Sequence, residues 1–236
     1  TSEEPNEKSV NRVTFYSDVK IDVTPVLDKD GNQKSIGDAI NVDGPGSKVE
    51  IKGDGKVQID GDIHVLNGGK IELNLKNKDS YFHGEAHIGK RQYGGDPDDP
   101  NDKPNGQNLF DENRDGSDPD KANTKFNFTM TNGSRWDATN TSKINNFNIS
   151  DGATVNFGNS KRNINISVEN LKGDGGTFNM HGKIADFTSE NKGQGIADKL
   201  IVRKSSEGDH KIIYKDDGTA PTKGNEYIKL VEYVTK

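Results

Sequence analysis

The chain has 236 residues, a formal net charge of −6 and no cysteine. Without cysteine, neither a disulfide framework nor a Cys-ligated zinc or iron–sulfur site can form. The acidic balance argues against a nucleic-acid-binding protein, whose contacts need concentrated Lys and Arg. No stretch approaches the roughly 18 consecutive apolar residues of a transmembrane helix, and the first residues do not resemble a signal peptide.

The apolar composition favours strands over helices. Ile and Val together number 32, against only 8 Leu. β-Branched side chains fit the pleated surface of a strand. The 27 Gly, 26 Asn and 26 Asp supply residues that tolerate tight turns and left-handed backbone conformations. This composition predicts many short strands joined by many turns.

In chain order, apolar residues alternate with polar ones in short runs from Val13 to Leu75, and again from Phe126 to Tyr214. Each run has the length of a strand, and no window shows a helical period. Turn-forming residues separate the runs, at 53–55, 60–62, 67–69, 132–133, 151–152 and 173–176.

The spacing of the runs predicts an all-β protein. Three runs fill about 20 residues, as in one coil of a solenoid. The steps from Ile51 to Ile71 and from Phe128 to Ile149 are read as single coils. We therefore expect a right-handed parallel β-helix. The alternative is an antiparallel sandwich or barrel, because Asn-Gly and Asp-Gly also form hairpins.

Residues 94–123 interrupt the pattern with a polar, acidic insertion rich in Asp, Asn and Pro. A loop of about 30 residues is too long for an ordinary connection, so it is either functional or mobile. A solenoid tolerates such an insertion because each coil contacts only its neighbours.

The second half of the chain resembles the passenger domains of classical (type V) autotransporters. Residues 131–136, 142–147 and 151–157 are similar to their late β-helix coils, and the only Trp, Trp136, lies in the first of these segments. Further motifs resemble, in order and spacing, the pertactin-like C-terminal passenger region, called the autochaperone or stem. These motifs are at residues 175–180, 197–202, 208–214 and 227–232. Residues 126–236 carry the resemblance.

The resemblance implies two regions, β-helix coils over 1–171 and the start of an autochaperone cap over 172–236. The remaining hairpins, the linker helix and the protein's own outer-membrane barrel would follow Lys236. It further implies a non-enzymatic segment at the bacterial surface or secreted, exported through the periplasm and outer membrane. Such a segment would be the stalk and folding nucleus of an adhesin.

The partners that the resemblance implies are receptors on host cells or bacteria, or other copies of the chain, and no nucleic acid. Two alternatives stay open. The chain could be the stalk of an autotransporter whose protease or esterase domain lies upstream. It could also be a polysaccharide-degrading β-helix, for which Asp54, Asp60 and Asp62 are candidate carboxylates. Turn formation is the simpler role for these three Asp residues.

His83, Glu85 and His87 are candidate ligands of a divalent metal, because alternate residues of a strand share one face. Phe82, Ala86 and Ile88 would then point inward. The alternative is an ordinary polar strand face in solvent.

Asp111, Asn113 and Asp115, followed by Gly116, match the first half of an EF-hand-type calcium loop. Ala122 replaces the Glu expected at position 12, although Asp118 and Asp120 could substitute for it. A solvated acidic loop without calcium is the alternative. We therefore expect no cofactor, unless this loop binds calcium.

No nucleophile elbow, phosphate loop or dinucleotide fingerprint occurs in the sequence. Asn residues recur in the strands after residue 144, among them Asn145 and Asn146. Stacked amides can satisfy one another and the backbone, so we interpret them as structural ladders.

Overall fold

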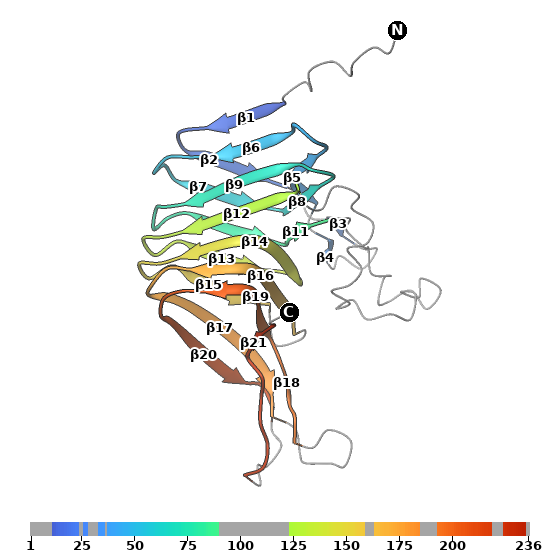
Figure 1. Cartoon of the computed structure of the whole chain (residues 1–236), viewed down its shortest axis with the longest axis vertical. Coiled ribbons are helices and arrows are strands. Elements are labelled where there is room, and N and C mark those ends of the chain that lie inside the picture. Colours follow the sequence, from blue (N-terminus) through green and yellow to red (C-terminus); the bar gives the residue numbers. More distant parts are fainter. Residues whose placement is uncertain are drawn as a thin grey trace, which may run out of the picture.

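The structure is a computed structural model of the whole chain. It describes residues 11–23, 26–27, 33–35, 37–89, 123–158, 163–184, 193–218 and 224–234. Short strands wind into coils that stack along the long axis of the molecule (Figure 1). Each coil has three sides, which we call side one, side two and side three. Pairing within each side is parallel, apart from one two-residue strand on side two, so the predicted parallel β-helix is confirmed.

Sides one and three share one 11-stranded sheet, because β14, β16 and β19 continue from one side into the next. Side one consists of β1 (Arg12–Phe15), β6 (Lys48–Ile51), β9 (Lys70–Leu75), β12 (Lys125–Met130) and the C-terminal halves of β14 (Ser142–Ile149), β16 (Asn165–Lys172) and β19 (Lys199–Ser206). Side three consists of β5 (Asp38–Asp43), β8 (Asp62–Leu66), β11 (Ala86–Ile88), the N-terminal halves of the same three strands and β21 (Val231–Tyr233).

Side two is the 8-stranded sheet. It consists of β2 (Val19–Asp22), β7 (Val57–Asp60), β10 (Tyr81–Gly84), β13 (Arg135–Ala138), β15 (Thr154–Phe157), β17 (Gly176–Lys183) and β20 (His210–Asp216), with β18 (Ile196–Ala197) antiparallel to β17. A separate antiparallel pair joins β3 (Val26–Leu27) and β4 (Gln33–Ser35). Side two therefore receives one strand from each of seven coils.

The core runs through the middle of the stack and consists of the inward residues of all three sides. Its centre is an aromatic cluster around Trp136, whose ring stacks on Phe82 at 5.8 Å and lies 5.4 Å from Phe128. The indole Nε1 donates a hydrogen bond to the carbonyl oxygen of Gly84 at 3.1 Å, so its polar group is satisfied inside the core. Phe147 contacts both Trp136 and Phe178, and so links this cluster to a ring that lies two coils beyond Trp136.

Turns predicted from Asn-Gly and Asp-Gly pairs lie at corners of the coils. Asn132 and Gly133 have φ of 54° and 71°, and Asp151 and Gly152 have 50° and 74°. Both pairs connect side one to side two. These left-handed conformations are readily adopted by Asn, Asp and Gly, which explains their place in the sequence.

The predicted coil steps are wrong by two residues. Ile51 pairs with Leu73 rather than Ile71, a step of 22 residues, and Phe128 pairs with Phe147 rather than Ile149, a step of 19. Because side chains alternate with a period of two, a shift of two residues keeps the same inward face. Apolar periodicity therefore cannot distinguish these registers.

The insertion does not disturb the stack. β12 follows it and pairs with β9 through six consecutive residue pairs, from Lys125 with Lys70 to Met130 with Leu75. Residues 90–122, which contain most of the insertion, lie outside the described residues. β16 ends at Lys172, the predicted start of the cap, and parallel pairing continues in the next strand, because β17 pairs with both β15 and β20.

Candidate functional site

The three predicted metal ligands around residue 85 do not share one strand face. β10 ends at Gly84 and β11 begins at Ala86, and Glu85 occupies the corner between side two and side three. His83 therefore belongs to side two and His87 to side three. The inward alternation was predicted correctly, because the three apolar neighbours are buried: Phe82, Ala86 and Ile88. The expected solvent-facing Glu85 is wrong, since its exposure is only 4%.

His83 contacts a carboxylate of the preceding coil. Its Nδ1 lies 3.3 Å from Oδ1 of Asp60, and the hydroxyl of Tyr81 donates to Oδ2 of the same carboxylate at 2.6 Å. This hydrogen bond to Asp60 stabilises the protonated phenol and raises the pKa of Tyr81 to about 12. Asp60 is thus held between two side chains of the neighbouring strand.

Glu85 and His87 belong to a different polar cluster. Oε1 of Glu85 lies 3.7 Å from Nδ1 of His87 and 3.8 Å from Nε2 of His64. Its other oxygen accepts a hydrogen bond from Nδ2 of Asn140 at 2.9 Å. The rings of His64 and His87 meet edge to face, with centroids 6.3 Å apart. Two of the three predicted residues therefore do come together, but beside a histidine of the preceding coil.

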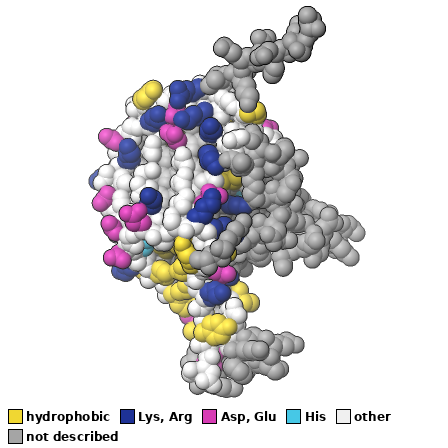
Figure 2. Space-filling view, in the orientation of Figure 1, with side chains coloured by type: hydrophobic (Ala, Val, Ile, Leu, Met, Phe, Trp, Pro, Cys, Tyr) yellow, Lys and Arg dark blue, Asp and Glu magenta, His cyan; other side chains and the backbone are white. Residues whose placement is uncertain are grey.

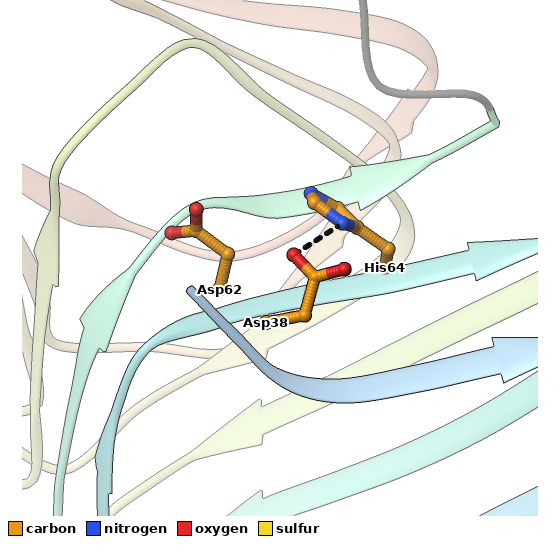
Figure 3. Close-up of side chains that lie close together, drawn as sticks. All are labelled: Asp38, Asp62 and His64. Carbon is orange, nitrogen blue, oxygen red and sulfur yellow. Dashed lines mark ion pairs between the residues drawn. The ribbon is translucent and has the colours of Figure 1, made fainter. Parts of the chain in front are cut away.

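The same cluster extends to two Asp residues on side three (Figure 3). Nδ1 of His64 lies 3.1 Å from Oδ1 of Asp38, and Oδ1 of Asp62 accepts a hydrogen bond from the backbone N–H of Glu85 at 2.7 Å. One ligand atom from each of Asp38, Asp62 and His64 lies within 4.8 Å of the others. Asp62 and His64 are buried, with exposures of 2% and 3%.

An imidazole and two carboxylates form a donor set that suits a divalent transition metal. Among the described residues, Asp38, Asp62 and His64 are the group of side chains that could hold such an ion. Their contacts with one another and with Glu85 also account for the cluster as a polar network. Sequence reasoning missed both Asp38 and His64 as ligands. Asp62 and His64 alternate along β8, which is a signal within one strand, whereas Asp38 lies in the preceding coil and gives no such signal.

The candidate carboxylates for polysaccharide cleavage do not converge. Asp60 ends β7 on side two, whereas Asp62 begins β8 on side three. The Asp54 side chain is 87% exposed and lies 3.8 Å from Nζ of Lys76. Each carboxylate therefore has a different neighbourhood, which fits turn and network roles better than a pair acting on one glycosidic bond.

The candidate calcium ligands Asp111, Asn113 and Asp115 lie outside the described residues, and calcium binding stays a prediction. The interpretation of the Asn residues as structural is supported. Asn146 donates to Asn127 and accepts from Asn170, each at 2.7 Å, in a ladder across three coils. Asn145 accepts a hydrogen bond from the backbone N–H of Phe126 at 2.7 Å.

These features define the class of the protein as a parallel β-helix with a continuous core and polar networks at its corners. No helix in the described part of the chain is long and apolar enough to span a membrane.

Residues 144–235 match the family model described as Pertactin. No curated protein and no solved structure matches the chain. The C-terminal part of the chain is thus a pertactin-like segment, consistent with an autotransporter passenger domain, and the resemblance drawn from its motifs is confirmed over this range. The Trp136 segment at 131–136 lies before the matched residues.

Proposed function

We propose that this chain is the stalk and folding nucleus of an adhesive autotransporter passenger, displayed on the bacterial surface or secreted. The observation that carries the proposal is the position of the pertactin-like segment, which coincides with the last coils of an uninterrupted stack. Its role is to bind and to display rather than to catalyse. The partners are receptors on host cells or bacteria, or further copies of the chain.

A C-terminal nucleus has a physical basis in the parallel stack. Each coil buries its inward face against the coil beside it, so a preformed coil is a template for the next. Phe178 on β17 shows the linkage, because its ring contacts Phe147 and Phe157 of the preceding coil and His210 of the following one. A passenger that emerges C-terminal end first could add coils to this template without an external energy source.

The folding order can be tested with two matched core substitutions. Phe178→Ala lies in the pertactin-like segment and Phe82→Ala in the N-terminal half, and both rings are fully buried. Each should destabilise the chain by about 3–5 kcal/mol. If the C-terminal coils nucleate, Phe178→Ala slows refolding, whereas Phe82→Ala mainly speeds unfolding. Stopped-flow fluorescence of Trp136 would measure both rates, and equal slowing of refolding by both variants would contradict a C-terminal nucleus.

Adhesion is tested on whole cells that display the complete passenger. We expect them to bind host cells or to aggregate with one another, and cells without the passenger to do neither. A catalytically silent passenger that supports neither kind of binding would contradict the adhesive role while leaving the folding result intact.

A further inference from the structure

The outer face of side two carries a surface hollow that shares Tyr81 with the Asp60 and His83 cluster described above. It has a volume of about 660 Å³ and extends across β7, β10, β13, β15 and β17. These strands belong to five successive coils, spaced about 4.8 Å apart as in any sheet. Inward residues such as Phe82 and Trp136 are buried, so their neighbours Tyr81 and Arg135 face outward into the hollow.

The hollow is positively charged although the chain as a whole is acidic. Three cations line it, Lys56, Lys78 and Arg135, against one carboxylate, Asp79. Both lysines are exposed, and neither forms an ion pair within the described part of the chain. Asp137, which pairs with Arg135 beside the hollow, adds a second carboxylate. The three cations and two carboxylates leave a local charge of about +1, in contrast to the overall −6. This contrast favours an anionic ligand.

Arg135 is held in position by contacts that leave some of its N–H donors available. Its Nε lies 2.7 Å from Oδ2 of Asp137, and its guanidinium carbon lies 5.6 Å from the centroid of the Tyr81 ring. A guanidinium carries five N–H donors in a rigid fork, so the terminal nitrogens remain for an acidic group.

Side-chain amides line the other part of the hollow. Nδ2 of Asn179 donates to Oδ1 of Asn156 at 2.7 Å, and Nδ2 of Asn156 donates to Oδ1 of Asp137 at 2.6 Å. These bonds fix the planes of both amides across neighbouring coils. Each amide has two N–H donors and two lone pairs, so unused donors and acceptors remain on the same side chain. Hydroxyl groups, which both donate and accept, are the natural partners of such a row.

We propose that this hollow binds an extended acidic polysaccharide, through carboxylate or sulfate groups on the cations and sugar hydroxyls on the amides. The row of polar side chains over five coils favours a linear chain over a compact ligand. The site lies on the flank of the stalk, so the displayed passenger would contact glycans along its length. Binding by the purified chain depends neither on surface display nor on folding order, so its failure is distinguishable from failure of the proposed function.

The test uses the purified chain in calorimetry or biolayer interferometry with four probes: polygalacturonate, dextran sulfate, neutral dextran and duplex DNA. We expect binding to one or both acidic polysaccharides and little to dextran or DNA. A preference for polygalacturonate or for dextran sulfate decides whether the acidic group is a carboxylate or a sulfate. The double variant Lys56→Ser/Lys78→Ser should lose about tenfold or more in affinity, because charge-assisted contacts are lost, and its binding should depend less on salt.

The matched control is Lys70→Ser/Lys172→Ser, which changes the net charge equally on side one. It should leave the affinity within about twofold, as expected for charges outside the contact region. Asn156→Ala should weaken binding while leaving the salt dependence unchanged, which a mere excess of positive charge would not produce. Thermal unfolding verifies that each variant is folded. The proposal is overturned by no binding to either acidic polysaccharide, by equal binding of DNA, or by an equal loss in the control pair.

Discussion

His210 begins β20 and lies against the apolar core at the C-terminal end of the stack. Its ring meets that of Phe178 edge to face at 5.6 Å. Both ring nitrogens are buried and have no hydrogen-bond partner among the described residues. Burial therefore lowers the pKa of His210 below its ordinary value, an effect that the nearby Asp174 and Asp209 only partly oppose.

This lowered pKa predicts a pH dependence of stability. The unfolded chain binds a proton at His210 at a higher pH than the folded chain does. The contribution of neutral His210 to stability is thus complete above about pH 6.5. It is lost as the pH falls through the lower pKa of the folded state. Urea unfolding between pH 5 and 8 should show this loss, and His210→Phe should reduce it. An unchanged pH profile in His210→Phe would rule out His210 as the titrating group.

Glu50 is a second ionisable residue whose pKa is set by its surroundings. It is almost fully buried, yet its carboxylate receives Lys48 at 2.8 Å, Lys52 at 2.7 Å and Arg12 at 2.7 Å. These cations, with the hydrogen bond from Lys48 first, lower the pKa of Glu50 to about 2. Lys48 also reaches Glu72 of the next coil, so the cluster connects three successive strands of side one.

At the scale of the element, the corners decide where each strand ends. Gly84 ends β10, and a Cβ there would collide with the backbone carbonyl of Gly61 in the preceding coil. At Gly152 a Cβ would meet nothing within 4 Å, but φ is 74°. One corner therefore needs glycine for close stacking and the other for a left-handed backbone.

Two alanine substitutions separate these requirements. Gly152→Ala should cost about 1–2 kcal/mol, the usual penalty of a left-handed conformation for an L-residue with a side chain. Gly84→Ala should cost more, about 3 kcal/mol, because the neighbouring coil must move. Equilibrium urea unfolding measures both. Equal losses would show that the contact at Gly84 relaxes easily.

At the scale of the whole molecule, exposed large apolar side chains concentrate at the two ends of the stack. Val13, Phe15 and Tyr16 lie in the first coil, and Ile212, Val231 and Tyr233 are among those in the last. Figure 2 shows the apolar side chains gathered near the C-terminal end, whereas Lys, Arg, Asp and Glu intermingle over the coils above. The inward face of a terminal coil has a neighbouring coil on one side only.

The continuity of the stack predicts that the acidic insertion is dispensable for folding. The insertion stands between β11 and β12. At the equivalent corner of the preceding coil, residues 67–69 are enough to connect β8 to β9, and β12 pairs directly with β9. Replacement of residues 90–122 by a short Gly/Ser linker should therefore leave Tm within about 5 °C. Loss of cooperative unfolding in the shortened chain would refute this. If residues 111–115 bind calcium, the ion should raise Tm of the full chain and leave that of the shortened chain unchanged.

The sequence by itself determined that the protein is all-β, while its periodicity left both a β-helix and an antiparallel sandwich or barrel open. Alternating Ile, Val and Phe with Asn-Gly and Asp-Gly corners predicted the strands, because period-two burial and left-handed turns are local properties. The ordered motifs after residue 144 determined the family of the C-terminal part for the same reason, as they are contiguous in the chain. β21 lies beyond the last predicted run, which ends at Tyr214, and was missed.

Only the tertiary structure decided which residues meet across coils. The partner of Ile51 is Leu73, because inward faces alone do not distinguish registers that differ by two residues. Asp38 joins His64, and Lys56 joins Arg135 at the same hollow, through stacking of segments that are distant in sequence. The corner at Glu85 likewise separates His83 from His87, which a straight strand would have placed together. In this β-helix each strand is encoded by contiguous residues, whereas the polar clusters and the hollow are formed by residues from neighbouring coils.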